Sequence, residues 1–412
     1  MMKKKISQLI SISWRNIWRN KVRSGVVIAA VAIGMFAAIY ASALATGMIK
    51  DKVKEGIEVE TSFIQIHAQQ FREDLDPSLT MHWSDQRQKR LFDIDGVDGV
   101  SPRYKMTAMA STAETGRGVE MLAVDPVMES NTTTIASMVS DGTWLDGSKK
   151  RNRIVIGKKL AEKLKVRLKS KVILSFQNQK GDIVGAAFRV VGIYNTTDSR
   201  FEEQFVYVKD LDIRRIASLD ANNIHEVAIH INNPEKLDEI SSVVTQLFAK
   251  EEVLTWKKIS PELGYSMEVS SFYMLIFVIV VLISLGFGIV NTMMMVVLER
   301  VREFGILMAI GMQRAKIFWM VILESVWLCI IGGVTGIVLS LVAILASQDG
   351  IDISSKAEGF EAMGYSTILR PYIDISELGL IVVLVILTGI FAAIVPAKKA
   401  LKNNPCESIR TI

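Results

Sequence analysis

Long apolar stretches alternate with polar segments along this chain, and they set its most basic division. Four of them lack charged residues almost completely, and they cover residues 24–49, 269–298, 317–348 and 378–397. A helix needs about 20 predominantly apolar residues to cross the hydrocarbon core of a membrane. The pattern therefore predicts four transmembrane helices, the last of which ends at Pro396.

A different pattern fills the interval between the first two apolar stretches, residues 50–268. Short runs of alternating apolar and polar side chains indicate strands, and Asp-Gly pairs indicate turns. The expected strands are residues 62–67, 105–113, 119–124, 171–176, 188–192 and 204–208. Helical periodicity covers residues 158–168 and 234–249. The predicted fold is an α-helical membrane protein with four transmembrane helices, plus a large α+β domain inserted between the first and second spans.

Composition supports this mixture of membrane-embedded and water-exposed parts. The 412 residues are 50% hydrophobic and 22% charged, and the mean hydropathy is +0.30. The apolar content excludes a disordered chain, and the presence of only two cysteines excludes a disulfide scaffold. The formal net charge of +5 comes from residues 1–23, where every charged side chain is basic. Because this excess lies beside the first apolar stretch, it is a topology signal, and nucleic acid is not an expected partner.

Basic residues flank the apolar stretches on one side only, which predicts the orientation of the chain. They lie in residues 1–23, in the short connection 299–316 and in the tail 398–412. These segments are expected in the cytoplasm, the first as an amphipathic N-terminal helix, so both termini are expected to be cytoplasmic. The domain of residues 50–268 and the loop 349–377 are then expected to be extracytoplasmic.

Signals for catalysis or metal binding are poor. The histidines, including His225 and His230, lack the spacing of metal ligands, and no hydrolase or protease motif is present. The nearest approach to a phosphate-binding loop, Gly142 to Lys149, has Ser148 where the required lysine should be. We therefore expect no catalytic residue, no bound metal and no cofactor in this chain, and ATP-driven work would need another polypeptide.

Three motifs are more specific than the rest of the sequence. They are residues 14–24 (WRNIWRNKVRS), residues 299–311 (ERVREFGILMAIG) and residues 396–410 (PAKKALKNNPCESIR). Together they closely resemble permeases of the FtsX-like superfamily of ABC transporters, which includes macrolide-exporting and lipoprotein-releasing permeases. Phe304 and Met308 depart from the second family motif, which has isoleucine and arginine there. The resemblance spans nearly the whole chain and includes its order of one span, a large MacB-like outer domain and three further spans.

The resemblance implies a permease subunit that works by mechanotransmission in the cell inner membrane. A separate ABC ATPase dimer would bind ATP and Mg²⁺ in the cytoplasm, and its closure would move the outer domain, where substrate is handled. The chain length and the lack of a fused ATPase favour the lipoprotein-releasing branch, which extracts lipoproteins or other amphiphiles. The alternatives are a regulator of a cell-wall hydrolase and an exporter of peptides or antibiotics. Membrane lipid and a second permease, identical or related, are the other implied partners.

The second motif supplies the candidate ATPase-coupling residues. They are Glu299, Arg300, Arg302, Glu303, Gly305 and Gly311, and the four charges are expected on exposed turns of an amphipathic coupling helix. Such a helix suits a groove on a cytoplasmic ATPase, and the glycines would permit a close approach or a tight exit. The alternative is a stop-transfer loop whose charges only hold the topology.

Two further features of the spans are candidates for function. Small residues recur at four-residue spacing: Ala30, Gly34, Ala38 and Ser42 in the first span, and Gly332 and Gly336 in the third. They predict close helix packing, either within this chain's own bundle or between two permease subunits. Glu324 is the only ionisable residue inside a predicted span, and an intramembrane carboxylate is a functional candidate. The alternative is a structural role in which Glu324 pairs with Arg23 or Lys316.

Overall fold

The structure is a computed structural model that describes residues 2–145, 150–220, 222–353, 359 and 364–402. The chain divides into two compact units. The helical unit comprises residues 1–48, 268–352 and 368–412, and the mixed unit comprises residues 49–267 and 353–367. Residues 146–149, which belong to the glycine-containing segment considered as a phosphate loop, and residues 403–412 of the tail lie outside the described residues.

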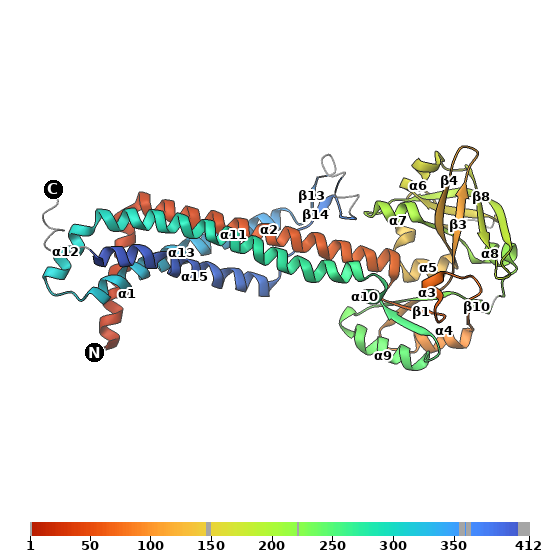
Figure 1. Cartoon of the computed structure of the whole chain (residues 1–412), viewed down its shortest axis with the longest axis horizontal. Coiled ribbons are helices and arrows are strands. Elements are labelled where there is room, and N and C mark those ends of the chain that lie inside the picture. The colour runs from red at the N-terminus through yellow and green to blue at the C-terminus, as the bar shows by residue number, and fades with distance from the viewer. Residues whose placement is uncertain (1, 146–149, 221, 354–358, 360–363, 403–412) are drawn as a thin grey trace. The chain divides into compact units, whose positions relative to one another are not determined.

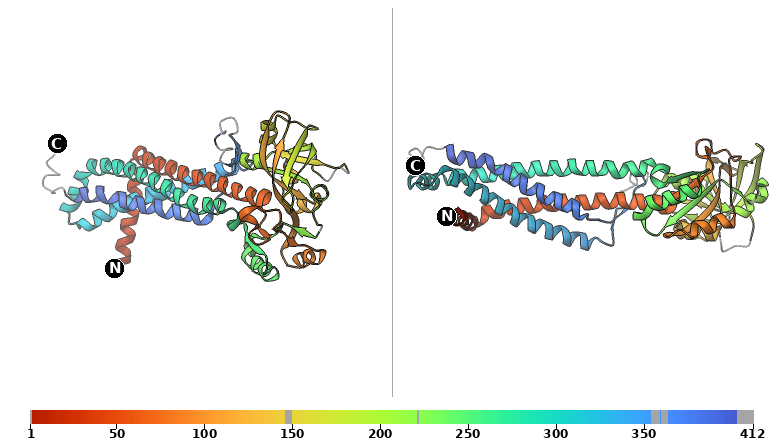
Figure 2. Two further views of the ribbon diagram at one scale, coloured as in Figure 1. Left: turned by 45° about the vertical axis from the view of Figure 1, so that its right-hand side comes forward. Right: turned by 90° about the horizontal axis from the view of Figure 1, so that it is seen from below.

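Long apolar helices form the helical unit (Figure 1). Among the described residues, four helices are long and apolar enough to cross a membrane: α2 (Lys21–Glu55), α11 (Pro261–Glu299), α13 (Arg314–Ala346) and α15 (Ile375–Lys402). Their parts in this unit lie alongside one another (Figure 2). The shorter elements are α1 (Met2–Arg19), α12 (Val301–Ala309), and the paired strands β13 (Ile351–Asp352) and β14 (Ile368–Leu369). By length and composition, the chain is a multi-pass membrane protein.

Two helix ends differ from the prediction. The helix expected over residues 1–23 breaks at Asn20, where α1 gives way to α2, and the Ser24 hydroxyl donates to the Ile17 carbonyl near the end of α1 (2.6 Å). Pro396, which was expected to end the fourth span, lies inside α15, and this helix continues to Lys402. A proline inside a helix leaves one carbonyl without its usual donor, a loss that transmembrane helices tolerate when their neighbours compensate for it. The prediction of a helix end at Pro396 is therefore wrong.

Contacts within the helical unit account for most of the small residues in α2 and α13. A Cβ atom added to Gly332 or Gly336 would lie 2.7 Å from atoms of α2, so only glycine fits at either position. Gly34 faces Leu285 of α11, and Ala38 is buried in the same apolar core. The remaining two are Ser42, whose hydroxyl donates to Glu377 of α15 (3.2 Å), and Ala30, which is exposed. Five of the six residues thus make contacts within this chain.

A ten-stranded sheet is the centre of the mixed unit. Its strands are β1 (Ile64–His67), β3 (Val97–Ser111), β4 (Gly116–Val124), β5 (Val139–Gly142), β6 (Arg153–Gly157), β7 (Lys171–Gln177), β8 (Ile183–Tyr194), β9 (Phe205–Lys209), β11 (Glu226–Ile231) and β12 (Glu252–Thr255). Their order is β12-β1-β11-β3-β4-β9-β6-β8-β5, and β7 pairs with β3 and β8. The pairs β4–β9 and β6–β8 are parallel and the other pairs are antiparallel. A separate small pair is formed by β2 (Met81–His82) and β10 (Asn223–Ile224).

Short helices accompany the sheet. They are α3 (Phe71–Asp74), α4 (Asp85–Phe92), α5 (Pro126–Thr132), α6 (Lys158–Leu164), α7 (Ser199–Gln204), α8 (Asp210–Ala217), α9 (Leu237–Leu247) and α10 (Trp256–Ile259), with single turns at Ile135–Met138 and Pro234–Lys236. The six predicted strands overlap β1, β3, β4, β7, β8 and β9, and the two predicted helices overlap α6 and α9. The α+β class of this domain is therefore confirmed.

Four strands of the sheet were not predicted from the sequence: β5, β6, β11 and β12. The two most buried of these are β6 and β11. In β6 nearly every residue is buried and the three central side chains are apolar, so the alternation that marks a half-buried strand is absent. In β11 the polar residues Glu226 and His230 alternate with apolar ones, although five of its six residues are buried. Buried side chains of these strands, such as Ile154, Ile156, Val227 and Ile229, belong to the main apolar core of the unit.

Candidate functional site

The helical conformation is interrupted on both sides of a short helix at one end of the helical unit. Helix α11 ends at Glu299, Arg300 alone is not helical, and α12 begins at Val301. After α12, Gly311 has a φ of +94°, a left-handed conformation that favours glycine. Its amide donates to the Met308 carbonyl (3.1 Å), so the chain turns sharply toward α13. Helix α12 is therefore a separate short helix connected to two long ones by only a few residues.

Arg300 is the centre of a charged cluster beside α12. Its Nη1 donates to both oxygens of Glu324 on α13 (3.1 and 3.2 Å), and its Nε donates to Glu303 Oε2 on α12 (3.0 Å). Glu303 also accepts two hydrogen bonds from Arg19 Nη2 on α1 (2.5 and 2.7 Å). Asn16 Nδ2, also on α1, donates to Glu324 Oε1 (2.6 Å). One arginine thus joins α12 to α13, and through the two glutamates it is connected to α1.

A fourth ion pair extends the cluster to α2 and α11. Arg23 near the start of α2 pairs with Glu299 at the end of α11. The cluster then contains three arginines and three glutamates, so its formal charges cancel. A pocket of about 260 Å³ lies among these residues, and Val27, Met293 and Leu328 form its apolar wall. The chemistry that this arrangement offers is the making and breaking of ion pairs.

Within the cluster, exposure to solvent rises from Glu324 to the Arg19–Glu303 pair. Glu324 is 5% exposed, whereas the side chains of Arg19 and Glu303 are 54% and 45% exposed. Burial opposes the positive charge of Arg300, but Glu324 and Glu303 outweigh it and raise the pKa of Arg300 above its ordinary value. Burial also opposes the negative charge of Glu303, and hydrogen bonds from Arg19 and Arg300 lower its pKa. Both groups therefore remain charged at neutral pH, and the Arg19–Glu303 pair is open to water.

The opposite face of α12 carries no part of this cluster. Arg302 is exposed, and Ile306 and Ile310 are 49% and 77% exposed. Residues four apart share one face of a helix, so these three side chains form one surface, which we call the α12 outer face. Phe304 and Gly305 are buried on the other side. Helix α12 thus presents one face to the bundle and another to its surroundings.

The structure brings together four of the residues singled out from the sequence: Glu299, Arg300, Glu303 and Glu324. The expectation that all four charges of the motif lie on exposed turns is wrong for Arg300. Its side chain is only 14% exposed, because it turns inward between its two glutamate partners. Of the four charges, Arg302 alone lies on the α12 outer face.

The partner of Glu324 also differs from the expectation. Glu324 accepts hydrogen bonds from Arg300 and Asn16, and neither Arg23 nor Lys316 makes an ion pair with it among the described residues. Sequence reasoning missed Asn16 completely. The signal that could have found it is the repeated Trp-Arg-Asn triplet, whose four-residue spacing places both asparagines on one helical face.

The histidines of the mixed unit have local partners. The Lys105 amide donates to His225 Nδ1 (3.1 Å), and His230 Nδ1 lies 2.6 Å from Asp98 Oδ1. Within the part of the chain that the structure describes, no group of three or more histidine, cysteine, aspartate or glutamate side chains could hold a metal ion.

Both units match known families. Residues 24–247 match the MacB-like periplasmic core domain, and residues 275–405 match the FtsX-like permease C-terminal region. The macrolide export ATP-binding/permease protein MacB of Bordetella avium (strain 197N) is 34% identical over 131 residues, which are 32% of this chain and 18% of that protein. An uncharacterized ABC transporter permease of Methanocaldococcus jannaschii is 24% identical over 280 residues, 66% of this chain and 65% of that protein.

A third relative is named for lipoprotein release. The lipoprotein-releasing system transmembrane protein LolC of Buchnera aphidicola subsp. Schizaphis graminum is 26% identical over 203 residues, 48% of this chain and 50% of that protein. The chain therefore spans less than two thirds of the length of each of these three relatives.

Proposed function

Because the chain belongs to the family of FtsX-like permeases with a MacB-like periplasmic core domain, we propose that it is the permease component of an ABC transporter. In this proposal a partner ABC ATPase dimer binds and hydrolyses ATP with Mg²⁺, and the permease converts closure of that dimer into movement of the mixed unit. The end of the helical unit that carries α1 and α12 then lies on the cytoplasmic side of the inner membrane, and the mixed unit lies outside.

The two-sided character of α12 is the observation that carries this proposal. Its outer face combines one exposed arginine, Arg302, with the exposed apolar side chains Ile306 and Ile310. Apolar area exposed to water favours a partner that covers it, and an arginine beside it adds a directed hydrogen-bonding group. We therefore assign the α12 outer face to the groove of the ATPase.

The other face of α12 supplies the route by which a push would reach the membrane helices. One residue separates α12 from α11, and a short glycine-containing turn separates it from α13. Arg300 adds direct ion pairs from this junction to Glu303 and Glu324. With so little chain to absorb movement, displacement of α12 would shift the ends of both long helices.

The substrate is proposed to be an amphiphile that leaves the membrane on the outer side. Two of the relatives are named for macrolide export and for lipoprotein release. We propose lipoprotein release as the specific activity, with a second copy of this chain or a related permease completing the membrane part. Photo-crosslinking from the mixed unit to a lipoprotein would support this substrate, and crosslinks to peptides alone would contradict it.

Co-purification tests the proposed function. A tagged chain is expected to bring down an ABC ATPase from detergent-solubilised membranes, and Ile306→Glu or Arg302→Glu is expected to reduce the recovered ATPase at least tenfold. Ile183→Glu is the matched control, because Ile183 is 83% exposed and belongs to the mixed unit. Recovery of no ATPase with the unmodified chain would contradict the proposal.

A further inference from the structure

Helix α2 connects to the sheet of the mixed unit through a strained turn. After Glu55 the helix continues as a π-helical turn, Gly56–Thr61, and Ser62 then begins the extended chain that enters β1. Ser62 has φ +58° and ψ −178°, a combination that is essentially restricted to glycine. The residue is completely buried. Such a conformation persists only where the surroundings impose it, and π-helical turns are frequent at functional sites.

Hydrogen bonds fix Ser62 on both sides. Its amide donates to the Ile57 carbonyl in the π-helical turn (2.7 Å), and its hydroxyl donates to the Ile229 carbonyl on β11 (2.7 Å). The Phe63 amide donates to the same carbonyl (3.2 Å), and the Thr61 hydroxyl donates to the Ser62 carbonyl (2.9 Å). We call residues 56–63 the Ser62 junction. Within it, the backbone has hydrogen bonds to the helix behind it and to the strand beside it.

Other elements of the mixed unit hold the helix just before and within the junction. Thr197 donates its amide and its hydroxyl to the two carboxylate oxygens of Glu55 (2.7 and 2.6 Å). The Thr134 amide donates to the Glu58 carbonyl (2.9 Å). Both threonines lie far along the chain from α2, so the end of this helix is bound to distant parts of the same unit.

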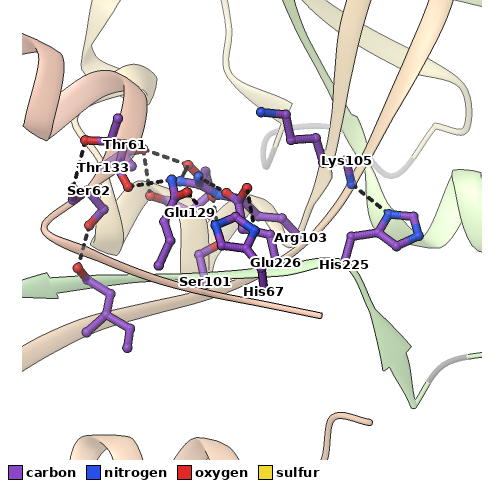
Figure 3. A network of polar contacts seen from close by, with 12 residues as sticks. Thr61, Ser62, His67, Ser101, Arg103, Lys105, Glu129, Thr133, His225 and Glu226 are labelled. Carbon is purple, nitrogen blue, oxygen red and sulfur yellow. Dashed lines mark hydrogen bonds and ion pairs between the residues drawn. The ribbon is translucent and has the colours of Figure 1, made fainter. Parts of the chain in front are cut away.

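A buried row of ionisable side chains, which we call the ionic row, lies beside the junction (Figure 3). His67, Glu226 and Arg103 occupy opposed positions on the adjacent strands β1, β11 and β3. Arg103 donates to Glu226 (2.8 Å), and through two nitrogens to both oxygens of Glu129 on α5 (2.7 and 2.9 Å). Burial opposes these charges, but Arg103 outweighs it and lowers the pKa of Glu226 to about 2. Arg103 and Glu226 therefore stay charged, and the register of their strands fixes their geometry.

Gln65 connects the ionic row to the junction. Its Nε2 donates to the Thr61 carbonyl at the end of the π-helical turn (2.7 Å), and its Oε1 lies 2.9 Å from His67 Nε2. All of these side chains are buried. The end of the π-helical turn and strand β1 are therefore linked by side-chain hydrogen bonds, and His67 lies opposite Glu226 on the neighbouring strand.

We propose that the Ser62 junction is a rigid elbow that delivers movement of α2 to strands β1 and β11. This inference rests on the proposed function, because it concerns how an ATP-driven movement enters the mixed unit. Only Ser62 and Phe63 separate the helical turn from β1, and their conformation is imposed by hydrogen bonds to β11. A loop with freedom at this point would absorb the displacement. A strained residue held from both sides passes it on, so Ser62 acts as a positioning residue for the sheet.

Replacement of Ser62 by glycine tests the elbow, because glycine adopts the same φ and ψ without strain and also allows many others. The complete permease–ATPase complex is placed in lipid nanodiscs, and hydrogen exchange of β1 and β11 is measured with and without ATP plus vanadate. The nucleotide-dependent difference in exchange reports transmission, whereas the absolute exchange reports stability. Ser62→Gly is expected to reduce that difference at least threefold while ATPase binding is retained.

Two further variants keep this test decisive. Ser218 also has a positive φ (+55°), but it lies at the exposed end of α8, so Ser218→Gly is expected to behave like the unmodified chain. Ser62→Ala removes the hydroxyl but retains the backbone restriction, and at least half of the response is expected to remain. A full response in Ser62→Gly would overturn the elbow, and an equal loss in Ser62→Ala would assign the effect to the hydroxyl instead. Absence of any nucleotide response in the unmodified complex would overturn the proposed function together with this inference.

Discussion

Two clusters in this chain combine one arginine with two glutamates in opposite surroundings. Around Arg103 in the mixed unit, all three side chains are at most 2% exposed. Around Arg300 in the helical unit, side-chain exposure ranges from 6% to 45%. A fully buried charge depends on the partners that the fold gives it, whereas a half-exposed charge can exchange its partner for water. The comparison therefore separates a fixed cluster from one that can rearrange.

The secondary-structure elements that supply the residues agree with this difference between a fixed and an adjustable cluster. Arg103 and Glu226 are directly opposed on paired strands, so the register of the sheet determines their contact. Arg300, Glu303 and Glu324 come from the α11–α12 break, α12 and α13, and contacts between separate helices change when one helix shifts. A fixed cluster suits a part that is moved as a unit, and an adjustable cluster suits the place where movement is received.

The largest effect is expected for Arg103→Met. This variant leaves Glu129 and Glu226 buried without a counter-charge, so the free energy of unfolding of the mixed unit is expected to fall by about 3–5 kcal/mol. Denaturant unfolding in detergent, with hydrogen exchange of β3 and β11 as the local readout, measures this loss. Replacement of all three residues by apolar side chains is the control and should cost less than the single change. A loss below about 1 kcal/mol in Arg103→Met would remove the proposed contrast between the clusters.

The next effect is a pH dependence to which His67 contributes from its position opposite Glu226. Burial lowers the pKa of His67 from 6.5 to about 4, although Glu226 opposes this shift. Between pH 6.5 and 4 the His67 imidazole is mostly protonated in the unfolded chain and mostly neutral in the folded unit. The stability contributed by neutral His67 is therefore fully present above pH 6.5 and is lost as pH falls toward 4, by up to about 3 kcal/mol.

Denaturant unfolding of the mixed unit at pH 7 and pH 4.5 measures this dependence. His67→Gln is expected to reduce it, although His225, whose pKa burial also lowers, still contributes. His82→Gln is the control because His82 is exposed. If the two variants keep the same slope as the unmodified chain, the dependence has another origin.

A smaller effect is expected for Glu324→Gln in the adjustable cluster. The change weakens the contacts with Arg300 and Asn16, but Arg300 keeps Glu303 as a partner, so local opening of α12 should become easier by only about 1–2 kcal/mol. Hydrogen exchange of α12 amides measures this opening, and exchange of the mixed-unit strands should not change. A loss as large as that of Arg103→Met would show that this cluster is equally rigid.

The smallest effect is expected for Arg19→Gln. Arg19 and Glu303 are both about half exposed, and ion pairs of this kind contribute at most about 1 kcal/mol. The same exchange measurement on α12 should change less than in Glu324→Gln, and added salt should remove most of the difference from the unmodified chain. An effect that exceeds that of Glu324→Gln would show that the more exposed ion pair contributes more, which contradicts the comparison.

Much of the fold could be predicted because its signals are local. The spans follow from apolar length, and strands such as β3 and β7 follow from alternation of side chains along a half-buried surface. Gly311 was singled out from its motif, and its positive φ explains why glycine occupies that turn. These features depend on residues that are neighbours in sequence.

The rest depends on contacts between residues far apart in the chain. Arg103 meets Glu226 only through strand pairing, and Asn16 reaches Glu324 only because α1 packs on α13. The strain at Ser62 has no sequence signal at all, because serine does not favour this conformation and only the surrounding hydrogen bonds impose it. Tertiary partners of this kind cannot be read from periodicity or composition.

The most direct test of the central claim, that α12 docks an ABC ATPase through its outer face, is site-specific photo-crosslinking in intact membranes. A benzoylphenylalanine replaces Ile306 on that face, and the same group replaces Ile183 on the mixed unit as the control. The account predicts an adduct with the ATPase subunit from position 306 and none from position 183. Absence of an ATPase adduct from position 306, with the complex intact by co-purification, would contradict it.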